Sequence, residues 1–390
     1  MVESGPVVVY GLSTEGYLIA SSLVSNNVKT TLIDEKLHLA TEITSETVSA
    51  YSSAMELMEE ESLLGMTPMG EVISESKVIF FTPRIRRTGD EAAKDLRSIF
   101  STLLKNITED TLIFFCIPVG IAANMEIVEL AERVSGLNPK LDLTYCYLPL
   151  LPRSRSAITF GIDRIDQSFS AMNYTKLAEI KHPKAISLQL SELQYLKETI
   201  SWYAPMAAEL EAYRAINDTK ERKDLGKIMT RNIAYLDDMV DRLYDLRSIV
   251  SSLDTGEPLL YIASGILRSI DGYSRYLTDE LKKLIKERAL KASRTKVTLG
   301  WGYDRYEMRG EKIILNDALL ERIGDLVGDI ASTTGTGSSN GNGSELSLIT
   351  EDKVHLLIIC SKNDIKLLDR LDSRTLSNVI TMKANLLCDY

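Results

Sequence analysis

The stretch covering residues 7–35 constrains the fold of this chain more than any other part of the sequence. A β-branched run over 7–9 ends at Gly11, apolar residues at helical spacing follow, and a second apolar run closes on Asp34. Strand, tight turn, helix and strand in this order form the unit that holds a dinucleotide at the end of a parallel sheet. The sequence therefore predicts a Rossmann unit at the start of the chain.

The turn from Gly11 to Gly16 keeps the first and third glycines of the G-x-G-x-x-G pattern. Gly11 permits the tight turn and Gly16 lets the helix pack close to the strand, but Ser13 replaces the glycine at which the backbone approaches the pyrophosphate. A carboxylate at Asp34 meets the ribose and repels a 2′-phosphate, which favours NAD over NADP. The alternative is a domain that kept this fold and lost its ligand. The cofactor-binding candidates of this unit are Gly11, Ser13, Thr14, Gly16 and Asp34.

Charge and composition exclude several classes of protein. The chain has 390 residues, enough for two or three domains, and a formal net charge of −10, which argues against nucleic-acid binding by phosphate neutralisation. The one compact basic cluster, residues 84–87, is either a solvated loop or a phosphate-binding loop. Histidines and cysteines lack the spacing of metal ligands, so we expect no metal site and free, buried thiols. These residues are His38, His182, His355, Cys116, Cys146, Cys360 and Cys388.

No segment has the pattern of a membrane anchor or a leader. The longest apolar run, residues 112–123, contains Pro118 and is too short to span a bilayer. The first residues lead directly into a core strand without the pattern of a secretory signal. We therefore expect a cytoplasmic protein without a membrane partner.

The strand and helix patterns divide the chain into three consecutive parts. Alternation over residues 1–165 predicts a doubly wound parallel sheet. Residues 166–290 carry long helical stripes, which either pack as a core or form the seam of a homodimer. Residues 291–390 predict a smaller α/β domain, interrupted at 333–344 by a flexible, low-complexity tether. The expected fold class is α/β: a Rossmann domain, a central helical segment and a smaller Rossmann-like domain.

Six short stretches, spread over nearly the whole chain, match in order the motifs of one known family. They are Phe80-Phe81-Thr82-Pro83, Cys116-Ile117-Pro118-Val119-Gly120, the segment from Tyr145 to Asp163, Ser191-Glu192-Leu193, Lys296 to Tyr303 and Met382 to Leu386. In this order they resemble the UDP-glucose/GDP-mannose dehydrogenase family.

The resemblance implies an enzyme that uses NAD to oxidise the C6 alcohol of a nucleotide sugar to a carboxylate in two hydride transfers. It places Thr82 and Pro83 beside the cofactor, Cys116 near the nicotinamide and a nucleotide-sugar site in the third domain. It also implies a nucleophilic cysteine, in a G-x-C-x-P-K-D loop, that holds the aldehyde covalently between the two transfers.

The residues that carry this chemistry in the family are replaced here. Where the loop falls, residues 265–273 keep its Gly and Asp as Gly265 and Asp271, but Leu267 stands in the place of the nucleophile. The Glu of the family's N-P-E motif aligns with Leu150, its Lys with Tyr195 and its Asn with Thr199. A leucine cannot move a proton, and a tyrosine is a poor substitute for an ammonium that stabilises an oxyanion. The remaining catalytic candidates are Tyr195 and Asp271.

Three hypotheses follow from these substitutions. The first is a non-catalytic protein that binds NAD or a nucleotide sugar and acts as a sensor or partner subunit. The second is an active NAD-dependent oxidoreductase with altered chemistry, in which Tyr195 or Asp271 serves a single hydride transfer. The third is a ligand-free scaffold that kept its dimer and lost its pocket.

Overall fold

The computed structural model describes residues 6–60, 67–139, 141–216, 221, 234–334, 354–366 and 379–388. The chain divides into two compact units. The first consists of Met1–Ile200, Tyr244–Leu260 and Arg305–Gly310, and the second of Ser201–Leu243, Tyr261–Asp304 and Glu311–Tyr390. The three consecutive parts predicted from the sequence are a different division of the chain, and they stay a prediction.

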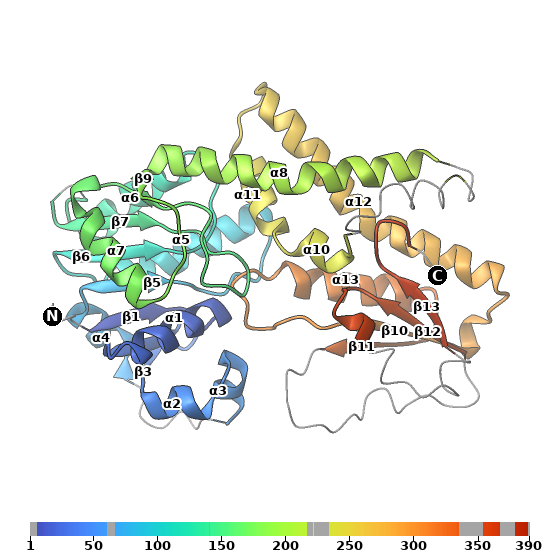
Figure 1. Cartoon of the computed structure of the whole chain (residues 1–390), viewed down its shortest axis with the longest axis horizontal. Coiled ribbons are helices and arrows are strands. Elements are labelled where there is room, and N and C mark those ends of the chain that lie inside the picture. Colours follow the sequence, from blue (N-terminus) through green and yellow to red (C-terminus); the bar gives the residue numbers. More distant parts are fainter. Residues whose placement is uncertain are drawn as a thin grey trace. The chain divides into compact units, whose positions relative to one another are not determined.

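Nine strands form the sheet of the first unit. They are β1 (Val7–Tyr10), β2 (Thr30–Asp34), β3 (Leu39–Ile43), β4 (Thr67–Pro68), β5 (Val78–Phe81), β6 (Thr111–Phe115), β7 (Leu143–Tyr147), β8 (Gly161–Ile162) and β9 (Ile186–Ser187). Their order is β4-β3-β2-β1-β5-β6-β7-β8-β9 (Figure 1). The five central strands, β2, β1, β5, β6 and β7, are parallel to one another. Strand β3 pairs antiparallel with β2, and β8 pairs antiparallel with β7. The doubly wound sheet predicted from the sequence is therefore confirmed.

The strand order reverses between β1 and β5. The chain runs from β1 outward to β2 on one side and from β5 outward to β6 on the other. Tyr10 pairs with Phe81 in the parallel register, so Gly11 and Thr82 leave the sheet next to each other. Ligands of doubly wound sheets bind in the crevice outside such a switch point.

Helices connect the strands of the first unit. They are α1 (Thr14–Ser25), α2 (Ser45–Ala50), α3 (Ala54–Glu60), α4 (Met69–Glu75), α5 (Gly89–Leu104), α6 (Ala123–Ser135), the 3₁₀ turn η1 (Ile165–Gln167) and α7 (Ser168–Leu177). Crossovers between parallel strands are right-handed, so α1 covers one face of the sheet and α5 and α6 cover the other. Accordingly, α5 and α6 contact each other.

Aromatic rings fill the core on both faces of β5 and β6, because neighbouring residues of a strand point to opposite faces. Phe80 lies parallel to Phe114, with 4.5 Å between ring centroids, and Phe100 of α5 meets Phe81 and Phe115 edge to face. All five side chains are buried. The apolar stripe of α5 supplies Phe100 because its spacing of three and four residues keeps one face of the helix toward the sheet. This packing fixes the ends of β5 and β6, from which the candidate site is built.

The second unit contains a smaller sheet whose strands are all parallel. Its order is β11-β10-β12-β13, with β10 (Thr295–Trp301), β11 (Asp329–Thr334), β12 (Val354–Ile359) and β13 (Val379–Lys383). Helix α13 (Glu311–Gly324) leads from β10 to β11, and Figure 1 draws these elements in orange and red. The smaller α/β part predicted near the end of the chain is thereby confirmed. Most of the predicted 333–344 tether, residues 335–344, lies outside the described residues.

The remaining helices described are four α-helices of the predicted central segment and one 3₁₀ turn just after it. They are α8 (Leu188–Ala215), α10 (Leu236–Val240), α11 (Leu243–Ser252), α12 (Pro258–Glu287) and the 3₁₀ turn η2 (Ala292–Arg294). Helices α10 and α11 are two separate short helices, and residues 222–233 lie outside the described part. The prediction of a loop over 265–273 is wrong, because these residues form the middle of α12.

No helix in the described ranges is long and apolar enough to cross a membrane.

Candidate functional site

The glycine turn packs directly against the end of β5. Gly11 has a φ of +126°, and a Cβ at this position would overlap the Thr82 carbonyl and the Pro83 nitrogen. Thr82 also donates a hydrogen bond from its hydroxyl to the Gly11 carbonyl at 3.3 Å. A Cβ on Gly16 would lie 2.6 Å from the Gly11 carbonyl oxygen. The structure thus brings together four of the predicted cofactor-binding residues, Gly11, Gly16, Thr82 and Pro83. Close packing within the protein is enough to explain why positions 11 and 16 are glycines.

The amide groups at the tip of the turn donate to acceptors of the protein itself. The Leu12 amide donates to Glu35 Oε2 at 2.9 Å, and the Ser13 amide to the Gly11 carbonyl at 2.9 Å. The Thr14 amide donates to the Tyr306 carbonyl at 2.8 Å. In dinucleotide-binding turns, amides at this place hold the pyrophosphate.

Side chains at the start of α1 turn inward. The Ser13 hydroxyl accepts a hydrogen bond from the Gly16 amide and so caps α1, as serine commonly does. The Glu15 carboxylate accepts from the Arg153 and Met308 amides at 2.7 and 3.0 Å. Burial raises the pKa of Glu15, although these amides and Arg309 favour its charged form. The Glu15 carboxyl group therefore already occupies the positive end of this helix.

The acidic pair at the end of β2 binds an arginine. Arg84 donates to Glu35 Oε1 at 2.7 Å, and its guanidinium lies 3.4 Å from Asp34 Oδ1. Asp34 also accepts from the Lys36 and Leu37 amides. The predicted ribose-binding carboxylate is therefore engaged in a turn and an ion pair.

The segment Arg305–Gly310 lies over the turn within the first unit. Arg86 donates to the carbonyls of Arg305 and Glu307 at 2.7 and 2.9 Å. Arg84 lies 5.5 Å from the centre of the Tyr306 ring. Of the basic cluster, residues 84–87, Arg84 and Arg86 therefore fasten this segment and the acidic pair. They form neither a solvated loop nor a phosphate site in this arrangement.

This arrangement does not fit a bound NAD. The amides of residues 12–14 are paired with Glu35, Gly11 and Tyr306, and α1 begins with the buried Glu15. A pyrophosphate would have to displace these acceptors and approach two carboxylates. NAD binding at this turn stays a prediction, and it requires a rearrangement of these contacts.

Cys116 follows β6 beside the turn residues of β5. Its amide donates to the Phe81 carbonyl, and its thiol donates to the Phe114 carbonyl with 3.6 Å between sulfur and oxygen. Burial, with the Glu15 charge, raises the pKa of the thiol. A thiol in this state is not a nucleophile.

A buried polar cluster occupies the place where the family carries its lysine. The Tyr195 hydroxyl of α8 donates to Asp245 Oδ2 of α11 at 2.5 Å, and Arg309 Nε donates to Asp245 Oδ1 at 2.7 Å. Arg309 also donates to the Leu150 carbonyl at 2.7 Å. Burial disfavours the charged guanidinium, but the Asp245 carboxylate reverses this effect and raises the pKa of Arg309. All four residues lie in the first unit and are buried.

The positions of the family's Glu and Asn carry no proton-transfer group, and the candidate Asp271 stays a prediction. Leu150 and Thr199 are buried at the positions of the family's Glu and Asn. Asp271 lies in the second unit, on an exposed position of α12. Among the described residues, no group of three or more His, Cys, Asp or Glu side chains could hold a metal ion.

Several residues of the site escaped the sequence analysis. Glu15 and Glu35 were overlooked although each is adjacent to a residue that was singled out, Thr14 and Asp34 respectively. Asp245 and Arg309 are 64 residues apart, and no motif connects them. Charged residues inside otherwise apolar stretches are the signal that could have drawn attention to Asp245.

Comparisons with known proteins support the fold. No family model and no curated protein matches the sequence. Similar solved structures include a UDP-D-ManNAc dehydrogenase from Pyrococcus horikoshii, at 15% identity and a TM-score of 0.66, covering 98% of this chain and 96% of that one. A UDP-N-acetyl-mannosamine dehydrogenase from S. aureus is similar at 12% identity and a TM-score of 0.62, with coverage of 98% and 95%.

A third similar structure is a UDP-glucose dehydrogenase from Pyrobaculum islandicum, at 13% identity, a TM-score of 0.60, and coverage of 98% of this chain and 94% of the other. The resemblance to nucleotide-sugar dehydrogenases that the sequence suggested is therefore confirmed at the level of the fold. At such low identities the likeness extends no further.

Proposed function

We propose that this chain is a non-catalytic protein with a nucleotide-sugar dehydrogenase fold, which does not oxidise a sugar C6 alcohol. The observation that carries this proposal is the Tyr195–Asp245–Arg309 cluster. A group that stabilises an oxyanion or takes a proton must reach the substrate. The Tyr195 hydroxyl instead donates to a buried carboxylate that already holds Arg309. A phenolate formed there would face the negative charge of Asp245.

Further support comes from the missing nucleophile. Residues 265–273 form part of a helix, and Leu267 stands where the covalent adduct would form. A second hydride transfer needs such an adduct to retain the aldehyde. The first of the three hypotheses, a protein that binds without catalysing, therefore has more support than the second.

For the cofactor, we propose that NAD binds the glycine turn only when the segment Arg305–Gly310 has left it. The Thr14 amide is the reason, because it offers no donor to a pyrophosphate while the Tyr306 carbonyl of this segment accepts from it. The sequence also predicted a nucleotide-sugar site. Because the similar structures are named as dehydrogenases of UDP-sugars, we propose a UDP-sugar as the first ligand to test for that site.

A direct assay tests these proposals. The protein is incubated with NAD and either UDP-glucose or UDP-N-acetylmannosamine, and NADH absorbance is followed at high protein concentration. We expect no NADH, and sustained NADH formation would overturn the non-catalytic proposal. Thermal unfolding is then measured with millimolar NAD or UDP-sugar, since a ligand of the native state raises the melting temperature. A shift with UDP-sugar alone supports the sensor role, and no shift with any ligand favours the scaffold.

We also propose a homodimer that uses α8. Leu190 and Leu193 are 57% and 45% exposed on this helix, and clustered exposed leucines favour a protein contact. Light scattering of the wild-type chain and of Leu193→Asp tests this interface. A wild-type monomer, or a variant that dimerises as well as the wild type, would exclude it.

A further inference from the structure

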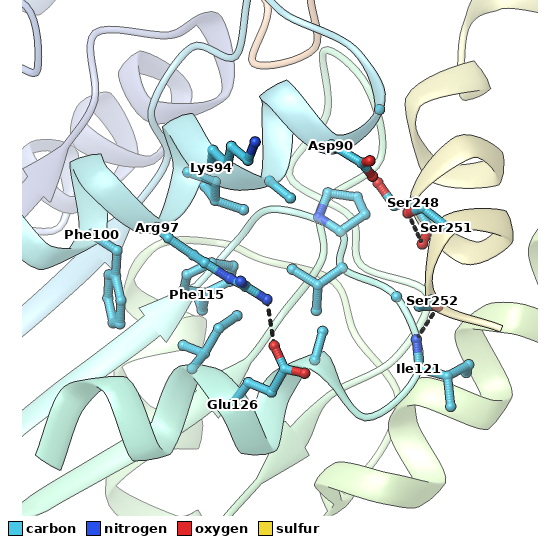
Figure 2. A pocket seen from close by; sticks show the side chains of 18 of the residues that line it. Asp90, Lys94, Arg97, Phe100, Phe115, Ile121, Glu126, Ser248, Ser251 and Ser252 are labelled. Atoms are coloured by element: carbon cyan, nitrogen blue, oxygen red, sulfur yellow. Dashed lines mark hydrogen bonds and ion pairs between the residues drawn. The ribbon is translucent and has the colours of Figure 1, made fainter. Parts of the chain in front are cut away.

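A cavity of about 450 Å³ opens between α5, α6 and α11, all within the first unit. Figure 2 shows its construction. Its base is closed by the buried side chains of Phe100 and Phe115. The partly exposed Ile121 and Leu130 supply apolar wall, and charged side chains of α5 and α6 and serines of α11 form the polar rim. A cavity of this volume, lined by both polar and apolar groups, is large enough for a small organic molecule.

The wall beside α11 is held in place by specific contacts. The Ile121 amide donates to the Ser252 hydroxyl at 2.8 Å, and Gly120 lies so close to Ser252 that a Cβ would overlap its side chain. On the other side of this loop, Glu192 accepts from the Ala122 and Asn124 amides at 2.9 and 3.0 Å. The loop therefore cannot collapse into the cavity without breaking buried hydrogen bonds.

The charges of the rim leave one cation, Lys94, for an anionic group of a ligand. Arg97 and Glu126 pair across the rim and compensate each other (Figure 2). Lys94 is exposed on α5 and lines the cavity, and within the described part of the chain its ammonium has no ion pair, so it is available to an anion. Asp90 lies one helical turn before Lys94, near Ser248 and Ser251. The four charges sum to zero, so the rim does not attract a polyanion.

We propose that this cavity binds an amphipathic organic monoanion, with its apolar body against the wall that includes Ile121 and Leu130 and a carboxylate or sulfonate at Lys94. The site is separate from the glycine turn, because none of Gly11, Ser13, Thr14, Gly16, Asp34, Thr82, Pro83 and Cys116 lines it. The proposal therefore does not depend on whether NAD binds, or on whether the chain is an enzyme.

Fluorescence titration with anilinonaphthalene sulfonate tests the site, because this probe is an aromatic monoanion. We expect one binding site per chain. Lys94→Gln should weaken binding about tenfold by removing a charge-assisted contact, and Ala93→Trp should abolish it by filling the mouth. Both positions are exposed on α5, so both variants should fold, which circular dichroism verifies.

Matched controls lie on the same helix, outside the cavity. Lys105→Gln removes a lysine at the end of α5, and Ser98→Trp adds the same bulk on an exposed position that does not line the cavity. Both should bind the probe like the wild type. Unchanged affinity in Lys94→Gln and Ala93→Trp, equal losses in the controls, or several probes per chain would overturn the proposal. A naphthalene disulfonate that bound more tightly than the monoanion would refute the charge selection.

Discussion

The Tyr195 hydroxyl donates to Asp245 Oδ2 at 2.5 Å, inside the first unit and out of contact with water. The same carboxylate accepts from Arg309 Nε at 2.7 Å. A buried ion pair gains its stability from such complementary hydrogen bonds, because both charges have lost their hydration. The residue in the place of a catalytic lysine is therefore tied into a structural cluster.

Removing the Tyr195 hydroxyl should measurably destabilise the protein. We expect Tyr195→Phe to lower the free energy of unfolding by about 2 kcal/mol, since it removes a hydrogen bond to a charged acceptor. Tyr203→Phe, on the same helix, removes a hydrogen bond to the neutral Met239 carbonyl and should cost about 1 kcal/mol. Urea unfolding of both variants measures the difference. A Tyr195→Phe variant as stable as the wild type would contradict the structural role.

Gly11 should tolerate no side chain, for reasons that do not involve a ligand. Gly11→Ala combines a strained φ with overlap against Thr82, so we expect a loss of at least about 3 kcal/mol. Gly256 has a comparable φ of +108°, but no atom lies within 4 Å of the place that a methyl group would take, so Gly256→Ala should cost only about 1 kcal/mol. Thermal unfolding compares the two. Equal losses would show that the close approach at Thr82 contributes nothing.

Arg86 should hold the segment Arg305–Gly310 on the turn. Arg86→Ala removes the donor to three carbonyls of this segment, those of Arg305, Glu307 and Met308. We therefore expect a loss of about 2 kcal/mol and faster amide hydrogen exchange in residues 305–310. Arg87→Ala is the control, since Arg87 makes exposed ion pairs with Glu91 and Asp95 and should change stability by less than about 0.5 kcal/mol. If NAD raises the melting temperature of Arg86→Ala but not that of the wild type or of Arg87→Ala, this segment closes the crevice. Unchanged exchange in Arg86→Ala would show that other contacts hold it.

Asp163 should make stability depend on pH. Burial raises the pKa of its carboxyl to about 6, against hydrogen bonds from the Tyr145 and Arg164 amides. The folded state therefore holds a proton that the unfolded state releases near pH 4, and the contribution of Asp163 to stability falls as the pH rises from about 4 to about 6. We expect Asp163→Asn, which keeps the acceptor oxygen, to gain up to about 3 kcal/mol relative to the wild type at pH 7 compared with pH 4. A pH-independent difference between the two proteins would contradict the raised pKa.

Periodicity along the sequence determined the two parallel sheets and most of their helices. Strand and helix signals are local, because each element buries one face of a short segment. The β-branched run before Gly11 and the apolar stripe of α5 are therefore recognisable without any partner. The absence of a nucleophile at Leu267 was also visible in the sequence, because a leucine side chain has no nucleophilic group.

Only the tertiary structure decided how the charged groups are used. Glu35 and Tyr306 hold the amides of the glycine turn, and Asp245 holds Tyr195, through contacts between residues far apart in the chain. A pattern of residue types specifies which groups can form hydrogen bonds, but the pairing depends on which segments the fold brings within about 3 Å. For that reason the sequence could identify the glycine turn, while the pairing of its amides with the protein's own acceptors became visible only in the folded chain.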